Sequence, residues 1–339
     1  MKSTVTFMSK ITCAVLCVML LSSCLFNKYS VVLVVDKVIS EDDSFNKQAV
    51  DGIDLASKAF DFSSEKRIVK NDDEFVNILD SLSKNTDLVI GIGYKPQDSI
   101  IKSAEENPDI KYVSVDWIYD GPLDNVTGIS YKVQESSFLV GYIAGMTTKT
   151  NKIGFIGGVE NESILPFEYG YKAGIKYAEM ESGKQIEVQT FYLNNFDDVQ
   201  MAKNTAIDMY SNDIDIIFQA AGGAGTGVID AASEVKKYVI GVDKDQSYMA
   251  PDYVLTSALK NVKSTVYTVI EDYTDGNYYD QKTVYIGLYE GGVGIPDDNP
   301  LVDKDVMKRT LELKDLIING DIVPPTDKVS FETYVENIK

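Results

Sequence analysis

The chain has 339 residues, of which 44% are hydrophobic and 25% charged, as in ordinary globular proteins and unlike disordered or fibrous ones. Its 32 lysine and arginine residues face 52 aspartate and glutamate residues, and the formal net charge of −20 argues against nucleic acid as a partner. Histidine is absent, which excludes histidine-based catalytic triads, histidine-ligated zinc and a histidine pH switch.

The N-terminus has the pattern of a bacterial lipoprotein signal. An apolar run at residues 11–21 follows two lysines and ends in the sequence LSSC at residues 21–24. We expect residues 1–23 to be a signal peptide and Cys24 to be the diacylated first residue of the mature protein. A cleaved signal with an incidental cysteine is the alternative. No later stretch reaches the roughly 18 apolar residues of a membrane span, so we expect the lipid to tether the protein.

From Tyr29 onward, short β-branched runs alternate with helical patterns. The first alternation predicts one parallel sheet with helices on its faces, since Tyr29–Asp36 is apolar almost throughout, as in a strand buried on both faces. Its predicted strands are 29–36, 66–70, 87–93, 111–117 and 126–131, and its predicted helices are 46–60, 72–82, 96–106 and 134–146.

A polar linker at residues 147–151 precedes a second alternation of the same kind. Its predicted strands are 152–157, 186–193, 214–220 and 238–243, and its predicted helices are 167–180, 199–210 and 228–235. The remaining strands at 254–259 and 283–287 and helices at 262–273 and 302–319 are too few for a third domain.

This organisation predicts an α/β protein with the type I periplasmic-binding-protein fold. Two doubly wound parallel-sheet lobes would be joined by a multi-strand hinge, with the ligand cleft between them. We assign residues 24–147 plus 260–291 to the N-terminal lobe. Residues 148–259 plus 292–339 form the C-terminal lobe.

Charged residues stand where several predicted strands end. In open α/β sheets, ligands bind beyond the carboxyl ends of the strands, which makes Asp36, Asp116, Asp243 and Lys260 candidates for ligand contacts. Each of them, taken singly, could instead be a helix cap or a surface charge.

The start of the first helix is a further candidate. Phe45 and Asn46 lie in the loop that follows the first strand, although they could also be ordinary residues of a helix start. Ser44 could be simply an N-cap, and Asp42 and Asp43 simply acids that the helix dipole favours.

A glycine-rich segment at residues 221–227 (AGGAGTG) follows another predicted strand and should bring backbone N–H groups close to a ligand, with Gly222 as its candidate contact. It does not match a phosphate loop, because Val228 and Ile229 stand where Lys-Ser/Thr is needed. Carboxylates, an amide and a lysine favour an uncharged ligand with hydroxyls and ring nitrogens. Phe45 and Phe196 lie in corresponding loops of the two lobes and could enclose a flat ring, or could be ordinary half-buried aromatics.

Several long, ordered motifs carry a family resemblance that spans essentially the whole mature chain. They are DDSFN (42–46), SFLVGYIAG (137–145), KIGFIGG (152–158), FEYGYKAG (167–174), IIFQAAGGAGTGVI (216–229), VIGVDKDQ (239–246), VLTSALK (254–260) and GVGIPDDNP (292–300). At these motifs the sequence closely resembles the basic membrane protein family of bacterial lipoproteins, whose members include purine nucleoside receptors of spirochaetes.

The resemblance implies a function and a role for each candidate residue. The protein would be the substrate-binding subunit of an ABC transporter, a monomer without catalytic activity or cofactor that captures adenosine, guanosine or inosine for a permease at a bacterial membrane. The implied contacts are purine stacking by Phe45 and Phe196, base recognition by Asn46 and Asp116, and ribose recognition by Asp36, Gly222, Asp243 and Lys260.

Three other functions stay open at the level of sequence. A nucleoside hydrolase also binds ribose through aspartates, but its calcium site needs a carboxylate cluster, and Asp36 is followed by Lys37 and Val38. The protein could be a surface antigen or adhesin whose pocket is vestigial. It could also bind another small ligand, such as a sugar or an autoinducer.

Overall fold

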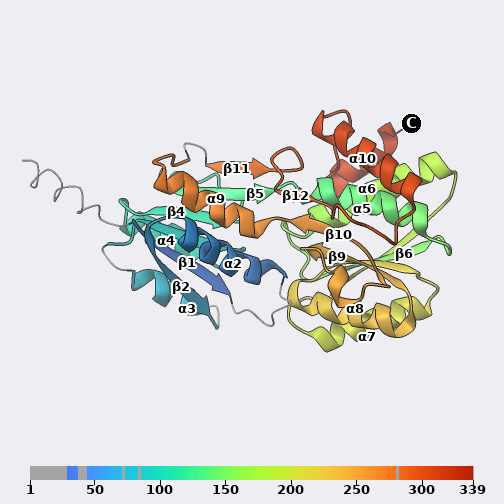
Figure 1. Cartoon of the computed structure of the whole chain (residues 1–339), viewed down its shortest axis with the longest axis horizontal. Helices are drawn as coiled ribbons and strands as arrows, with labels where there is room; N and C mark the ends of the chain where they lie inside the picture. Colours follow the sequence, from blue (N-terminus) through green and yellow to red (C-terminus); the bar gives the residue numbers. More distant parts are fainter. Residues whose placement is uncertain (1–28, 37–43, 71–72, 83–84, 280–281, 339) are drawn as a thin grey trace, which may run out of the picture.

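The computed structural model describes residues 29–36, 44–70, 73–82, 85–279 and 282–338. These residues form two six-stranded sheets, each covered by helices on both faces, and the two lobes lie end to end (Figure 1). The predicted signal peptide, the predicted lipidation site Cys24, and Asp42 and Asp43 lie outside the described residues.

The first sheet is parallel throughout and has the strand order β11-β5-β4-β3-β1-β2. Its strands are β1 (Tyr29–Asp36), β2 (Phe62–Val69), β3 (Leu88–Ile92), β4 (Lys111–Val115), β5 (Val126–Tyr131) and β11 (Thr283–Ile286). The strand predicted at 66–70 starts four residues earlier than expected, as β2. This edge strand exposes most of its polar FSSEKRIV sequence, so it lacks the apolar run by which a central strand is recognised.

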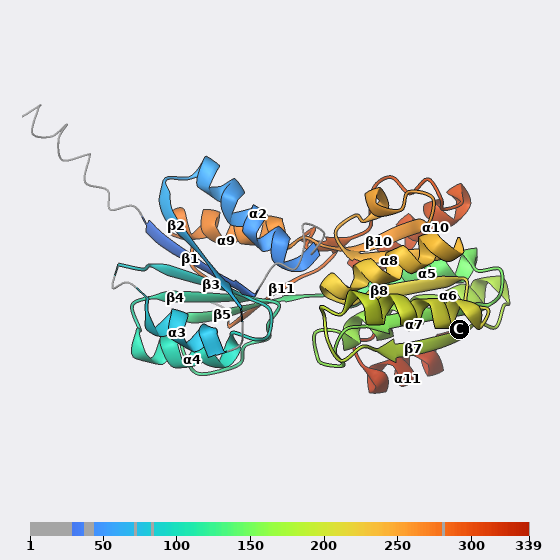
Figure 2. The same cartoon turned by 90° about the horizontal axis from the view of Figure 1, so that it is seen from below.

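Helices cover both faces of the first sheet. Helices α2 (Ser44–Ala59) and α9 (Val262–Thr274) pack together on one face, while α3 (Asp73–Asp80) and α4 (Gln97–Glu106) lie on the other (Figure 2). The return of the chain from residue 260 to form α9 and β11 thus completes this lobe.

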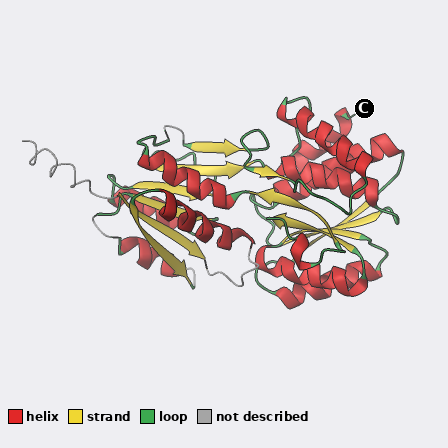
Figure 3. Ribbon diagram, viewed as in Figure 1, coloured by secondary structure: helices red, strands yellow, loops and turns green. Residues whose placement is uncertain are grey.

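The second sheet has the order β12-β10-β9-β8-β6-β7 and is parallel except for β12. Its strands are β6 (Lys152–Gly157), β7 (Glu187–Tyr192), β8 (Ile216–Ala220), β9 (Tyr238–Asp243), β10 (Val254–Lys260) and β12 (Val293–Gly294). Helices α7 (Val199–Ser211) and α8 (Gly225–Val235) cover one face. On the opposite face lie α5 (Val133–Thr147) and α6 (Leu165–Ser182), with α10 (Lys304–Ile318) and α11 (Lys328–Asn337) outside them (Figure 3).

The predicted lobe boundary at residue 147 is wrong, because α5 belongs to the second lobe. Its backbone contacts that of α6 at glycines on both helices: a Cβ atom at Gly141 would lie 2.2 Å from the Tyr171 carbonyl oxygen, and one at Gly174 would lie 2.0 Å from the Phe138 carbonyl oxygen. The chain therefore first crosses between lobes at Lys132. The polar segment at 147–151 is only the turn from α5 to β6.

The described chain passes between the lobes three times, at Lys132, at Asn261 and between β11 and β12. The crossings are bonded to one another: the Lys132 N–H donates to the Ile286 carbonyl at 2.9 Å, and the Asn261 N–H donates to the Gly292 carbonyl at 2.8 Å. These bonds hold the three crossing segments side by side as one hinge.

Two helical segments were not expected. The glycine-rich segment is helical from Gly222, first as a 3₁₀ turn (η2, Gly222–Ala224) and then as α8, so the helix predicted at 228–235 begins three residues early. Helix α11 has no buried residue, and therefore little apolar pattern to reveal it, but its N-terminus is fixed by a capping box between Asp327 and Ser330. No helix in the described part of the chain is long and apolar enough to cross a membrane.

A candidate ligand-binding cleft between the lobes

The carboxyl ends of the strands in both sheets point into the space between the lobes. In the first sheet the chain winds outward in opposite directions from β1 and β3, and in the second from β6 and β8, so each pair marks a topological switch point. A cavity of about 360 Å³ lies there, lined by residues of both lobes. This volume falls in the range of roughly 300 to 1,000 Å³ that is typical of small-molecule sites.

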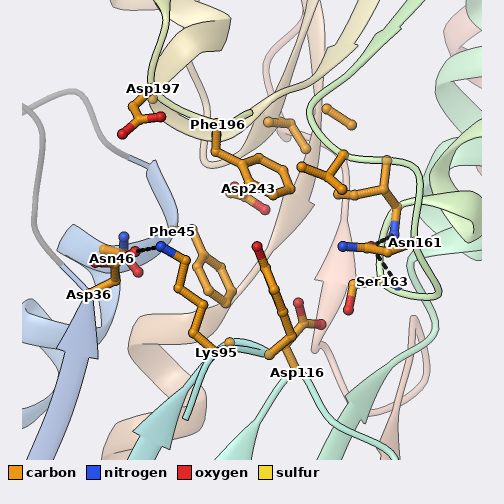
Figure 4. Close-up of a pocket in the computed structure, with 18 of the residues that line it drawn as sticks. Asp36, Phe45, Asn46, Lys95, Asp116, Asn161, Ser163, Phe196, Asp197 and Asp243 are labelled. Atoms are coloured by element: carbon orange, nitrogen blue, oxygen red, sulfur yellow. Dashed lines mark hydrogen bonds and ion pairs between the residues drawn. The ribbon is translucent and has the colours of Figure 1, made fainter. Parts of the chain in front are cut away.

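All eight residues predicted from the sequence as ligand contacts line this one cavity. They are Asp36, Phe45, Asn46, Asp116, Phe196, Gly222, Asp243 and Lys260. The close-up shows Asp36, Phe45 and Asn46 facing Phe196 and Asp243 across the cavity (Figure 4). The structure thus brings together residues as far apart in the sequence as Asp36 and Lys260.

The backbone is left-handed at five positions that line the cavity. Three are not glycine: Asp116 has a φ of 72°, Asn194 of 59° and Asp243 of 65°. Gly93 and Gly222 have φ values of 81° and 56°. This conformation disfavours most side chains but is tolerated by Asp and Asn, and such strain gathers at functional sites. Here it lets the chain turn sharply after a strand, within the cavity wall.

An ion pair in the cavity lining spans the two lobes. The Lys260 Nζ lies 2.9 Å from the Asp116 Oδ2, and Lys260 is only 3% exposed. Three rings surround the ammonium group, with centroids 4.6 Å away for Phe45, 5.1 Å for Tyr131 and 5.6 Å for Phe167. The resemblance implied that Asp116 contacts the base and Lys260 the ribose, whereas the geometry makes the two side chains direct partners.

The phenol of Tyr131 next to this pair stays neutral. Burial raises its pKa well above the ordinary value, and the carboxylates of Asp116 and Asp243 raise this pKa further. The Tyr131 side chain therefore adds no charge to this side of the cavity.

A second ion pair, not anticipated from the sequence, lies on the first lobe. The Lys95 Nζ is 2.7 Å from the Asp36 Oδ2, and both residues line the cavity. Among the described residues, the charged side chains of the lining are four carboxylates (Asp36, Asp116, Asp197, Asp243) and two lysines (Lys95, Lys260). Each lysine is paired with one carboxylate, and the carboxylates outnumber the lysines. The described lining therefore has a net negative charge, which disfavours anionic ligands.

Aromatic rings enter the cavity from both lobes. Phe45 comes from the start of α2 in the first lobe, and Phe196 from the loop between β7 and α7 in the second. Tyr94, in the loop after β3, lies with its ring centroid 6.5 Å from that of Phe196. Tyr94 thus adds a third ring to the two that the sequence suggested, and its contact with Phe196 joins the two walls of the cleft.

Buried amides fix the turns that carry Gly222 and Asp243. The Gln246 Oε1 accepts bonds from the Val242 N–H at 2.9 Å and from the Gln219 Nε2 at 2.8 Å, and the Gln219 Oε1 accepts from the Ala221 N–H at 3.2 Å. Both glutamines are fully buried. They tie the turn after β8 to the end of β9, and no sequence signal pointed to them.

Helix α2 of the first lobe is bonded to the second lobe beside the cavity. The Gln48 Nε2 donates to the Asp243 carbonyl at 3.2 Å and to the Lys260 carbonyl at 3.1 Å. This amide links the helix that carries Phe45 and Asn46 to the strand ends opposite.

The loops after β3 and β6 contribute residues that the sequence analysis missed. The first provides Tyr94 and Lys95, and the second provides Asn161 and Ser163. Applying the rule of polar residues after each strand to these two strands as well would have found them.

Comparison with known proteins decides the family. Residues 28–328 match the family model described as "ABC transporter substrate-binding protein PnrA-like". The chain belongs to this family. It is 36% identical over 302 residues to basic membrane protein A of Borreliella burgdorferi, and the alignment covers 87% of this chain and 88% of that protein. It is 37% identical over 308 residues to basic membrane protein D of the same species, covering 84% and 89% of the two chains.

Solved structures agree with the fold. A solute-binding protein of an ABC transporter system from Aeropyrum pernix aligns with a TM-score of 0.81 and 26% identity, over 91% of this chain and 96% of that one. The predicted type I fold with two parallel-sheet α/β lobes is confirmed. A cellobiose complex of the transcriptional regulator CelR, at 14% identity and a TM-score of 0.58, shows likeness of fold alone. Membership of this family makes the protein an extracellular or periplasmic substrate-binding component that serves a permease.

Proposed function

We propose that this protein captures purine nucleosides in the cleft between its lobes and presents them to the permease of an ABC transporter. It is held at a bacterial membrane by lipid on Cys24 and releases its ligand unchanged. The observation that carries the proposal is the convergence of Phe45 and Phe196, from opposite lobes, on one cavity that also holds carboxylates, an amide and a lysine.

The chemistry of the lining suits a nucleoside. A flat purine ring between Phe45 and Phe196 gains stacking as well as burial. The carboxylates of Asp36 and Asp243 can accept hydrogen bonds from ribose hydroxyls, and the Asn46 amide can both donate to and accept from a base edge. Asp116 can accept from a ring N–H while it remains bonded to Lys260.

Calorimetry on the domain without residues 1–24 tests the ligand class. We expect adenosine, guanosine or inosine to bind at least about tenfold more tightly than the matching free base, because the base alone leaves the sugar contacts unmade. AMP and GMP should bind more weakly still, since a phosphate would meet a lining of net negative charge. Nucleotides that bind as tightly as nucleosides would contradict the assignment of Asp36 and Asp243.

The same titrations separate the other functions. Tight binding of free ribose or another sugar, without binding of nucleosides, would favour a sugar-binding protein. Binding of none of these ligands would favour an antigen or adhesin role. Release of free hypoxanthine from inosine during incubation would reveal a hydrolase, and we expect inosine to be recovered intact.

The anchor is tested separately through Cys24. We expect Cys24→Ala to prevent acylation and to leave the protein unprocessed or free of the membrane, because lipid on this thiol is the anchor that the N-terminal motif predicts. The lipoprotein assignment would be contradicted if the original protein were still cleaved in the presence of globomycin, an inhibitor of the lipoprotein signal peptidase. Retention of the variant in washed membranes would contradict it as well. Cys17→Ala, in the signal peptide, is the matched control and should be acylated normally.

A further inference from the structure

A second hollow of about 730 Å³ adjoins the ligand cavity. The two spaces share four lining residues, Tyr94, Asp116, Asn161 and Ser163, which form a common wall. Asp116, Asn161 and Ser163 lie on the side of the inner cavity away from Asp36 (Figure 4). We call the second space the outer compartment; it is part of the same cleft between the lobes.

Several large apolar and aromatic side chains line the outer compartment. Trp117 follows Asp116 directly and packs against Tyr119 with ring centroids 5.0 Å apart. Ile118 is 54% exposed, Tyr285 50% and Tyr94 43%, and all three line the compartment. Large apolar side chains that gather on an exposed surface mark a contact with a ligand or partner.

Its described charged residues are acidic on balance. Asp116, Glu162 and Asp327 line it against a single lysine, Lys132. Hydrogen bonds to the N-terminus of α11 lower the pKa of Asp327, so this carboxyl is ionised at neutral pH. The compartment therefore suits a planar group that is uncharged or cationic and disfavours an anion.

The distribution of lining residues indicates which end of a nucleoside would face the outer compartment. Tyr94 of the shared wall lies beside Phe196, and Asp116 of the wall bonds to Lys260, whose ammonium lies over the ring of Phe45. A flat base held between Phe45 and Phe196 consequently has one edge toward the wall. Asp36 and Asp243, the carboxylates suited to ribose, line the inner cavity and are not part of the outer lining.

We propose that the outer compartment is a subsite for a planar, non-anionic substituent on the base edge of a purine nucleoside. The protein thus accepts N-substituted purine nucleosides as well as the parent compounds. This inference rests on the proposed function, since it assumes that the inner cavity holds a nucleoside.

Calorimetry with four ligands tests the subsite: adenosine, N6-benzyladenosine, N6-(4-carboxybenzyl)adenosine and 5′-O-benzyladenosine. We expect N6-benzyladenosine to bind within about threefold of adenosine or more tightly, since the ring gains stacking in the outer compartment. The carboxybenzyl analogue should bind about tenfold more weakly than the benzyl analogue because of the acidic lining. The 5′-O-benzyl compound carries the same bulk at the sugar end and should bind at least about 30-fold more weakly than adenosine.

Variants separate the subsite from the inner cavity. Trp117→Ala should weaken the binding of N6-benzyladenosine by about five- to tenfold and that of adenosine by less than about twofold, because Trp117 lines the outer compartment and not the inner cavity. Tyr289→Ala, an aromatic that is 80% exposed and lines neither space, should change neither affinity. Trp117 is the only tryptophan of the chain, so its fluorescence should also respond to the benzyl group.

The outcomes distinguish the two proposals. The subsite would be overturned, with the nucleoside function intact, if adenosine bound tightly and N6-benzyladenosine did not bind. The same conclusion would follow if Trp117→Ala lowered the affinities for both ligands equally. Tight binding of 5′-O-benzyladenosine in place of the N6 compound would overturn the orientation. Failure of all four ligands to bind, with guanosine and inosine also inactive, would overturn the nucleoside function and the subsite together.

Discussion

Replacement of Asp116 by alanine is expected to lower both the stability of the ligand-free protein and the affinity for nucleosides. The change leaves the Lys260 ammonium, 3% exposed, without its carboxylate partner 2.9 Å away. Removing one member of a buried ion pair costs about 3 kcal/mol, and rings around the cation recover only part of this. Loss of the acceptor for a base N–H adds about 1–3 kcal/mol to the binding free energy. Urea unfolding and calorimetry measure the two effects.

The double variant Asp116→Ala/Lys260→Met is the control for stability. Because it removes both charges, its free energy of unfolding should be higher than that of Asp116→Ala, while its affinity stays low. From sequence alone one expects a loss confined to affinity, since strand-end residues contribute little to a core. Unchanged stability in Asp116→Ala would contradict the importance of the ion pair, and unchanged affinity would remove Asp116 from the binding site.

Phe196→Ala is expected to reduce nucleoside affinity by about 30- to 100-fold, which corresponds to about 2–3 kcal/mol from lost stacking and lost burial of the base. Phe196 lies in a loop and is only half-buried, so the ligand-free protein should melt within a few degrees of the original. Calorimetry and thermal melting on the same preparations separate the two quantities.

The matched control is Phe191→Ala. Phe191 is 39% exposed on the neighbouring strand β7 and does not line the cavity, so its loss should leave affinity unchanged. Equal affinity for nucleosides in Phe196→Ala and the original protein would mean that the ring is structural. A large loss of stability in Phe196→Ala would mean the same.

The binding mode also depends on how the lobes are held. Gln48 bonds α2 to the ends of β9 and β10, the Asp116 and Lys260 pair spans the lobes, and Tyr94 contacts Phe196 across the cleft. A ligand that touches both walls favours this closed arrangement by its differential contacts with it. We expect the interlobe contacts and the ligand contacts to be formed together.

Much of the candidate site could be predicted because it obeys one rule. Parallel strands buried on both faces are recognisable as apolar runs, and their carboxyl ends meet at the cleft, so a charge just after such a run is informative. Asp36, Asp116, Asp243 and Lys260 were found in this way, and all four line the cavity.

The partners of these charges could not be predicted, because pairing depends on loops that come together only in three dimensions. Lys95 is 59 residues from Asp36, and nothing in the local sequence marks it as the partner. The lobe to which α5 belongs was also missed. Its glycines pack against α6. The chain crosses between the lobes at the single residue Lys132, which has no linker-like sequence, whereas the polar turn after α5 does resemble a linker.

A crystal structure of the domain with its tightest-binding nucleoside tests the central claim most directly. We expect the purine ring to lie between Phe45 and Phe196, with the ribose hydroxyls on Asp36 and Asp243 and a base edge toward Asp116. A nucleoside bound outside the cavity of these residues, or a base without contact to either phenylalanine, would contradict the account.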